Sequence, residues 1–324
     1  MTKREGLSLA GFFQRFPDDA AAEAWFTARR WPNGPECPHC GSTNIATIAS
    51  RKPMPYRCRG CRKHFSVTVG TIMQSTKLGL RAWLLAVYLL TTDAKGRSST
   101  KLGRDLDVQQ RTAWHLAHRI RKAMAAADSA AADVFAGPVE VDELYHGGLN
   151  RNRHASKRKR LGGGSVGKTP VIGMVDRATN RIAAMPIDRV KTDIVAGVVK
   201  QHVAPGASVY SDASQVYLWL HRLGYQHESV HHEHGEFVRG PVMTNAVESL
   251  WALFRRRCYG THHWMSVKHL HRYTAEAVSW HNLRPLTTTD RMALVATGME
   301  GQRLRYADLT ASPEPVPVPA GDPF

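Results

Sequence analysis

Three acidic residues stand at positions from which they could hold metal ions: Asp142, Asp212 and Glu248. Asp142 lies in the alternating run Val139-Glu-Val-Asp-Glu-Leu144, and Asp212 ends the run Ala207-Ser-Val-Tyr-Ser-Asp212, so both patterns predict strands, whereas Glu248 falls in an expected helix. Two divalent ions held by carboxylates about 3.5–4 Å apart activate water or a 3′-hydroxyl and stabilise the leaving oxygen of a phosphodiester. The set therefore predicts phosphodiester chemistry with Mg²⁺ or Mn²⁺.

Four further residues lie beside these acids. Asn245, three positions before Glu248, is a rival third ligand; we favour the glutamate because its charge binds a metal better. Arg255 follows Glu248 by seven positions and is a candidate catalytic cation. Glu140 and Glu143 flank the first aspartate, and we expect each to be a solvated edge residue.

Four cysteines form a second candidate metal site. Cys37 and Cys40 make one C-x2-C pair, Cys58 and Cys61 make another, and seventeen residues separate the pairs. This spacing predicts a structural zinc ion with four thiolate ligands and no open position for substrate. The alternative is a pair of disulfides, which are rare in the cytosol. Cys258, alone in a helical stretch, is expected to be a buried thiol.

The run Gly162-Gly-Gly-Ser-Val-Gly-Lys-Thr169 satisfies the phosphate-loop pattern. A phosphate loop needs a hydrophobic strand before it and a helix after it, but a basic segment precedes this run and Pro170 opens a strand. We therefore expect no ATP binding and a basic loop that contacts a DNA backbone. Its candidate contacts are Arg153, Lys157, Arg158, Lys159, Arg160 and Lys168.

The composition favours a nucleic-acid partner. The 324 residues are 43% hydrophobic and carry 44 Lys and Arg against 27 Asp and Glu, a formal net charge of +17, which favours a polyanion. The most apolar run, Trp83 to Leu90, is too short to span a membrane, and no leader is recognisable. We expect a cytoplasmic, nucleoid-associated protein with no membrane partner.

A helix-turn-helix-like pattern precedes the first acidic strand. Residues 99–106 and 109–124 predict two helices around a short turn. Arg111, Arg119 and Lys122 occupy polar positions of the second helix and are candidate DNA contacts, as is Arg256 farther along the chain. An ordinary basic amphipathic helix is the alternative.

From Val139 the pattern predicts strands, then a helix, another strand and further helices. The expected strands are 139–144, 170–176, 181–187 and 207–212, and the expected helices are 193–202, 217–223, 244–258 and 268–282. This order, with Asp, Asp and Glu at the stated places, matches an α/β ribonuclease H-like fold with a mixed five-stranded sheet.

Together these stretches resemble the ISXO-like transposases of bacterial insertion sequences over about residues 10 to 285. The resemblance rests on Trp31-Pro-Asn-Gly-Pro-Glu-Cys-Pro-His-Cys-Gly-Ser42, Tyr56-Arg-Cys-Arg-Gly-Cys-Arg-Lys-His-Phe-Ser66, Gly70-Thr-Ile72, Val141-Asp-Glu143, Gly167-Lys-Thr-Pro170, Ser211-Asp212, Asn245-Ala-Val-Glu-Ser-Leu-Trp251 and Lys268-His-Leu-His-Arg-Tyr273. Thirty-five residues separate Asp212 from Glu248, a spacing typical of DDE transposases and integrases, in which a basic residue often follows the Glu by seven. Some family members use Asn as the third active-site group, so Asn245 stays a rival.

The resemblance implies a zinc ribbon, a DNA-binding helical region and a catalytic domain that cuts and joins element ends. The expected organisation is a helical lead-in (1–30), zinc ribbon (31–75), helix-turn-helix-like region (76–128), ribonuclease H-like catalytic domain (137–284) and a Pro-rich, disordered tail (285–324). The expected partners are double-stranded DNA, as terminal inverted repeats and as target, and further copies of the chain in a homodimer or higher oligomer. A domesticated, non-catalytic zinc-ribbon repressor and a simple nuclease remain alternatives.

Overall fold

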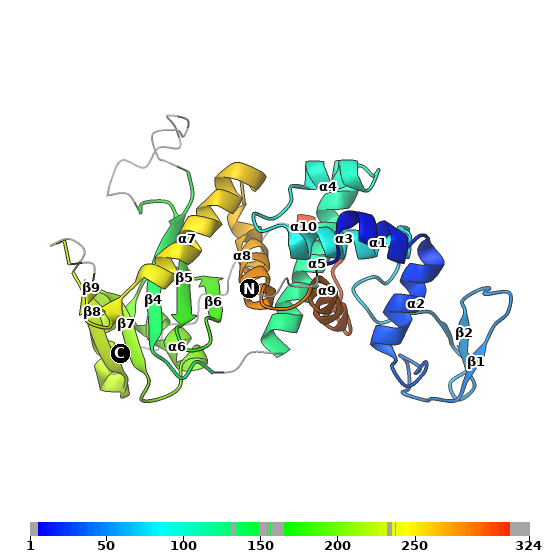
Figure 1. Cartoon of the computed structure of the whole chain (residues 1–324), viewed down its shortest axis with the longest axis horizontal. Helices are drawn as coiled ribbons and strands as arrows, with labels where there is room; N and C mark the ends of the chain where they lie inside the picture. The colour runs from blue at the N-terminus through cyan, green and yellow to red at the C-terminus, as the bar shows by residue number, and fades with distance from the viewer. Residues whose placement is uncertain are drawn as a thin grey trace.

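The computed structural model describes residues 6–130, 134–148, 154, 156, 165–231, 235, 236 and 238–311. The chain is elongated, with a small three-stranded sheet at one end, a five-stranded sheet at the other and helices between them (Figure 1). Of the helices described, none has the length and apolar character needed to cross a membrane.

The N-terminal part consists of two short helices and the ribbon. Side chains of Ser8 and Asp18 cap the two helices by accepting backbone N–H bonds. In the ribbon, Trp31, Tyr56 and Phe65 pack edge to face or tilted, with ring centroids 5.5–5.9 Å apart. The elements are α1 (Leu9–Arg15), α2 (Asp19–Arg30), β1 (Ile45–Thr47), β2 (Tyr56–Cys58) and β3 (His64–Phe65), in antiparallel order β1-β2-β3.

The central helices share one core with the N-terminal part. They are α3 (Leu80–Thr92), α4 (Ser99–Asp105), α5 (Gln110–Ala130), α9 (Thr288–Thr297) and α10 (Tyr306–Thr310). α4 and α5 form the predicted pair of helices around a short turn, and α5 extends beyond its predicted end at residue 124 to Ala130.

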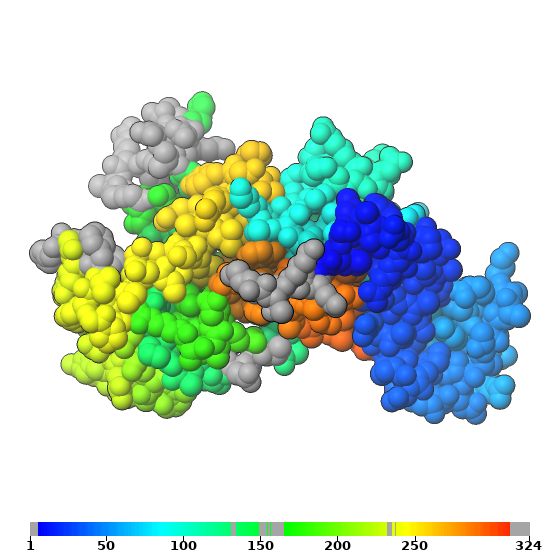
Figure 2. All heavy atoms as spheres, in the orientation of Figure 1, coloured from blue at the N-terminus to red at the C-terminus, as the bar shows by residue number. Residues whose placement is uncertain are grey.

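The C-terminal region differs from expectation. A disordered tail was expected from Pro285, but residues 288–297 and 306–310 form helices whose Met292 and Val295 are fully buried in the N-terminal core. At Gly298 a Cβ would collide with the backbone of α5 at Ala123, so the glycine permits close packing of α9 on α5. Figure 2 shows the orange part of the chain, which includes α9, between the green sheet and the blue N-terminus. Residues 312–324 lie outside the described residues.

The large sheet has strand order β6-β5-β4-β7-β8, as expected for a mixed five-stranded ribonuclease H-like fold. β6, β5 and β4 are antiparallel, and β4, β7 and β8 are parallel. The bounds are β4 (Val139–His146), β5 (Thr169–Asp176), β6 (Ile182–Pro186), β7 (Ser208–Asp212) and β8 (Gln226–Val230). The strand β8 was not among the predicted segments.

Helices cover both faces of this sheet. On one face Val139 and Val141 contact the core formed with α6 (Thr192–His202) and the 3-10 helix η3 (Gln215–Leu223). On the other face Leu144 and Val171 pack against α7 (Asn245–Arg257) and α8 (Val267–Leu283). A short hairpin of β9 (Val238–Arg239) and β10 (Val242–Met243) leads into α7, which continues as the π-helix η5 (Cys258–His262). The period-two alternation along β4 thus places successive side chains in different cores.

A buried carboxylate, Glu276 of α8, joins the central helices to the catalytic part. Arg121 of α5 donates to it at 2.5 Å, and Arg257 at the end of α7 lies 3.5 Å from it. All three side chains are at most 2% exposed. Burial alone would raise the pKa of Glu276, but the two arginines hold it below its ordinary value. The ion cluster therefore keeps its charges while linking three helices.

We expect Glu276→Gln to destabilise the protein by about 3–5 kcal/mol, because it leaves two buried guanidinium groups without their counter-ion. Chemical denaturation measures the effect. Glu300→Gln is the matched control: its carboxylate pairs with Arg30 at 3.2 Å but is 58% exposed, so about 1 kcal/mol or less is expected. Similar losses in the two variants would contradict the structural role given to Glu276.

Candidate active site and zinc centre

Asp142 and Asp212 lie on the two neighbouring parallel strands at the centre of the large sheet. The β4–β7 register pairs Val139 with Val209 and Glu140 with Tyr210. Extending this register by two residues along both strands places Asp142 opposite Asp212, on the same face of the sheet. Strands in a sheet are about 4.8 Å apart, so both carboxylates occupy the same region, Asp212 at the end of β7 and Asp142 in the middle of β4.

Glu140 fixes the helix that carries the third acid. Its Oε2 accepts the backbone N–H groups of Ala246 and Val247 at 2.7 and 3.1 Å, and its Oε1 accepts Arg177 Nε at 2.6 Å. The side chain is buried, so the expectation of a solvated edge residue is wrong. A carboxylate satisfies the free N–H groups at a helix N-terminus and opposes the positive end of its dipole. Glu140 thereby attaches α7 to β4.

Trp251 provides a second contact between α7 and β4. Its indole N–H donates to Asp142 Oδ2 at 3.0 Å, and its ring lies against Gly173, where a Cβ would come within 2.5 Å of a ring carbon. The Trp251 side chain is buried. Glu248 and Arg255 precede and follow it by three and four residues, so the helical period puts all three along one side of α7.

The charges of two of the predicted acids, Asp212 and Glu248, act on the third, Asp142. Burial raises the pKa of Asp142 to about 6; the backbone N–H of Glu143 and the Trp251 indole act against this, while the charges of Asp212 and Glu248 add to it. Glu248 Oε1 also accepts the Thr244 hydroxyl at 3.2 Å. The Asn245 amide instead points to Met243 Sδ at 3.6 Å. Asn245 carries no charge, so among these neighbours Asp212 and Glu248 are the ones whose charges raise the pKa of Asp142.

A fourth carboxylate, Glu143, belongs to the same region. Tyr217 of η3 donates its hydroxyl to Glu143 Oε1 at 2.5 Å. Burial raises the pKa of Glu143 to about 7, the Tyr217 hydrogen bond lowers it, and the charges of Asp142 and Asp212 raise it further. The expectation that Glu143 is a solvated edge residue is therefore also wrong. Strand alternation could have revealed this from the sequence, because it puts Glu143 on the same face of the strand as the buried Val141.

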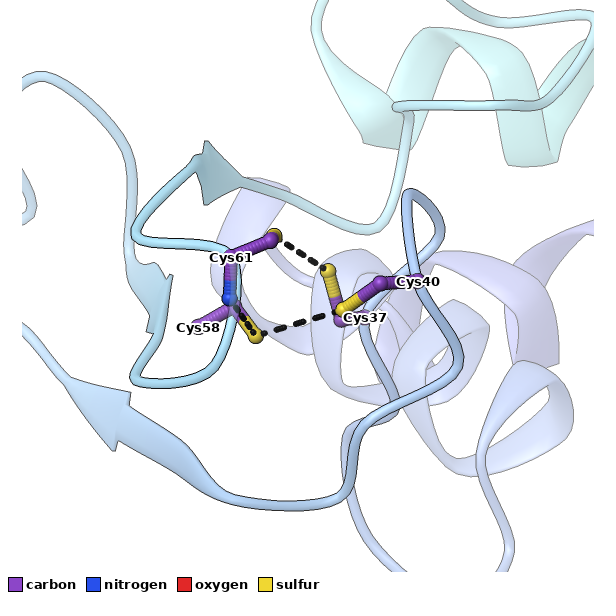
Figure 3. Close-up of side chains that lie close together, drawn as sticks. All are labelled: Cys37, Cys40, Cys58 and Cys61. Carbon is purple, nitrogen blue, oxygen red and sulfur yellow. Dashed lines mark hydrogen bonds between the residues drawn. The ribbon is translucent and has the colours of Figure 1, made fainter.

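The four ribbon cysteines converge on one point (Figure 3). The Sγ atoms of Cys37 and Cys61 are 3.6 Å apart, as are those of Cys40 and Cys58, and all four lie within 4.8 Å of one another. Tetrahedral zinc with bonds of about 2.3 Å needs sulfur separations of about 3.8 Å, so the set fits the ion. All four are free thiols in the structure, which excludes the disulfide alternative there.

Within the described residues this is the only cluster of three or more His, Cys, Asp or Glu whose ligand atoms are all that close. The predicted acids Asp142, Asp212 and Glu248 are thus not packed as closely as the four cysteines. Cys258 is buried, as expected, and burial raises the pKa of its thiol.

The candidate DNA contacts have different surroundings. Arg119 is wrongly predicted as a polar-face residue: it is buried, donates to the Gln74 carbonyl at 2.9 Å and lies 4.9 Å from the Trp83 ring centroid. Arg111 is exposed beside the Tyr306 ring, and Lys122 donates to the Arg303 carbonyl.

The remaining candidate contacts lie in the catalytic part. Arg256 is exposed on α7, and Lys168 immediately precedes β5, so Thr169 begins the predicted strand rather than a helix. Arg153, Lys157, Arg158, Lys159 and Arg160 lie outside the described residues.

The fold and the paired metal-binding patterns define a protein of the transposase class, and comparison with known proteins identifies the family. Residues 134–280 match the ISXO2-like transposase domain, and residues 17–64 match the transposase zinc-ribbon domain. An uncharacterised protein in the transposable element ISH50 of Halobacterium salinarum is 30% identical over 238 residues, which cover 70% of this chain and 79% of the relative. The chain belongs to the ISXO2-like transposase family.

A solved structure is more distant. The cryo-EM structure of a simian T-cell lymphotropic virus intasome with the PP2A regulatory subunit B56 gamma matches with 12% identity over 75% of this chain and 77% of that chain. Its TM-score is 0.25, so the match carries no argument about this fold.

We expect the purified protein to contain about one zinc ion per chain, bound by the ribbon thiolates. Cys58→Ser should lose the ion and open the ribbon, because a structural zinc site contributes folding energy directly. Elemental analysis and protease sensitivity of the N-terminal part are the measurements. Cys258→Ser, which alters a buried thiol elsewhere, should keep its zinc; zinc-free wild-type protein prepared without chelators would refute the assignment.

The acidic site should make stability pH-dependent. The pKa values of Asp142 and Glu143, about 6 and about 7, exceed the ordinary 3.8 and 4.5, so the folded state binds these protons more tightly than the unfolded state. Their stabilising effect is complete below the ordinary values and is lost as pH rises through about 6 to 7. The melting temperature of metal-free protein should therefore fall across that window, and Mg²⁺ should restore it.

Asp142→Asn should flatten this fall, because it removes one titrating group and lowers the repulsion on Glu143. Asp188→Asn, an exposed site between β6 and α6, makes the same change in net charge and should leave the fall intact. An identical pH profile for wild type and Asp142→Asn would contradict the assignment.

Proposed function

We propose that this chain is a DDE-type DNA transposase that binds the ends of its insertion sequence and catalyses metal-dependent strand cleavage and strand transfer. The observation that supports this most directly is the convergence of Asp142, Asp212 and Glu248. Two come from adjacent parallel strands, and the third comes from a helix attached to one of those strands.

The donor set suits hard divalent cations because it consists of carboxylates, and the charges of Asp212 and Glu248 raise the pKa of Asp142. Asp142, Asp212 and Glu248 would hold Mg²⁺ or Mn²⁺. Two such ions, when bound, supply activation of the attacking oxygen and stabilisation of the leaving oxygen.

The neighbouring residues position the acids. The Trp251 indole fixes the orientation of the Asp142 carboxylate, Glu140 fixes the start of α7, and the Tyr217 hydroxyl fixes Glu143. In strand transfer, the freed 3′-hydroxyl oxygen would bond to the target phosphorus while the target's own 3′ oxygen leaves.

Basic residues on α7 and before β5 would receive the DNA backbone. Arg255 and Arg256 are exposed near the end of α7, and Lys168 and Arg255 line one cavity beside Glu143. With a formal net charge of +17, the chain is suited to phosphate contacts that release counter-ions. Terminal inverted repeats and target DNA are the proposed substrates, and a homodimer or higher oligomer would hold two ends together.

Asp142→Asn, Asp212→Asn and Glu248→Gln should each reduce cleavage of end-containing DNA in Mg²⁺ at least about a hundredfold, since each removes a ligand of ions that contribute several kcal/mol. Side-chain volume changes little, so gel shifts should show nearly unchanged DNA binding. Asn245→Ala is the matched control on the same helix and should keep cutting.

Three outcomes would change the proposal. Undiminished cleavage by Glu248→Gln, with loss in Asn245→Ala, would make the asparagine the third ligand. Wild-type protein that cuts but does not join would be a simple nuclease. Wild-type protein that binds ends tightly without cutting would be a zinc-ribbon repressor.

A further inference from the structure

A cavity of about 380 Å³ adjoins the acidic site. One wall is the end of β4 from Glu143 to Gly148, and the other is formed by the end of α7 and the turn after it, including Phe254 and Trp264. Glu143 lines the cavity, and its pKa responds to the charges of Asp142 and Asp212. The cavity therefore lies beside the proposed catalytic site.

Aromatic side chains around this cavity are unusually exposed. Tyr145 is 40% exposed, Tyr259 67% and Trp264 66%. Each ring leaves much of its face open to solvent, although buried aromatics elsewhere in the chain pack against one another. Large exposed apolar groups gathered at one place commonly mark a binding site.

The backbone holds two of these rings in place. α7 does not end in a glycine turn but passes into the π-helix η5, followed by His263 with φ 57° and ψ −37°. π-helical turns and non-glycine residues with positive φ occur often at functional sites. This turn brings Tyr259 and Trp264 to the rim of the same cavity.

Two cations complete the lining. Lys168 approaches from the residue before β5, and Arg255 from α7. Flat aromatic faces beside two cations match the two halves of a nucleotide, because a base stacks on aromatic rings and a phosphate pairs with Lys and Arg. A base inside a duplex presents only its edge, so a ring face can receive it only when it leaves the stack.

We propose that this cavity is a subsite for one unstacked nucleotide of the DNA strand that the acidic site holds. Its base stacks on Trp264 and Tyr259, and its phosphate lies against Lys168 and Arg255. The identity of that strand rests on the proposed function, whereas binding of the nucleotide follows from the cavity. The subsite thereby holds the DNA strand next to the phosphodiester bond that lies at the carboxylates.

The test compares two short single strands of equal length, oligodeoxythymidine and an abasic strand with the same phosphates, by fluorescence anisotropy. Electrostatic contacts are equal for both, so any difference reports the bases. Wild-type protein should bind the thymidine strand about tenfold more tightly. Trp264→Ala should bring this ratio close to one, and Trp264→Phe should keep part of it.

Trp219→Ala is the matched control. Trp219 is 48% exposed and lies 4.0 Å from the Arg222 guanidinium, so it is also an open indole beside a cation, but it belongs to η3 on the opposite face of the sheet. This variant should keep the wild-type ratio. Because Trp264 is largely exposed, its substitution should leave the melting temperature unchanged.

Equal affinities of wild-type protein for the two strands would overturn the subsite, as would a preference that survives both Trp264→Ala and Tyr259→Ala. Cleavage of end-containing duplex is measured separately. Cleavage without base preference would refute the subsite and leave the proposed function intact. Base preference without cleavage would support the subsite and contradict the proposed function.

Discussion

The buried Glu276 carboxylate determines how the two halves of this protein are joined. Taking a carboxylate out of water is costly, and here two guanidinium groups on different helices offset that cost. Arg121 comes from the longest helix of the DNA-binding region, and Arg257 ends the helix that carries Glu248. Removing Glu276 would leave two guanidinium charges in the interior without a counter-ion, so this carboxylate holds the halves in one relative position.

The catalytic helix is fixed at both of its ends by acidic residues that take no direct part in the proposed chemistry. Glu140 binds its first backbone N–H groups, and Glu276 binds Arg257 at its last turn. Between these points Trp251 contacts Asp142 across the sheet. A rigid helix matters here because carboxylates that repel one another would otherwise separate. Because the strands and the helix that carry the carboxylates are restrained, these like charges stay close to one another.

The sequence was sufficient to predict much of the fold and the four-cysteine cluster, since strand alternation and the two cysteine pairs are local signals. The roles of Asp142, Asp212 and Glu248 stay predictions. β8 escaped prediction because Gln226-His-Glu-Ser-Val230 is a short, mostly polar edge strand without an apolar alternation. Arg119 and Glu140 were misread for another reason. Their burial depends on partners 45 and 106 residues away, the Gln74 carbonyl and the start of α7, which periodicity does not reveal. The tail was misjudged because the Pro-rich end obscured Met292 and Val295, which pack on distant helices.

The return of the chain's later residues to its earlier ones has a consequence for biosynthesis. Ile72 donates its N–H to the Met299 carbonyl and Gly301 donates to Gly70, while Leu304 and Leu309 complete a core begun by Phe12. On the ribosome, the first half must therefore wait, with part of its apolar surface uncovered, until about residue 309 has emerged. Contacts this remote in sequence slow folding and lengthen exposure to aggregation. A nascent chain would thus complete the core of its first half only after the large sheet had been synthesised, so the two halves finish folding together.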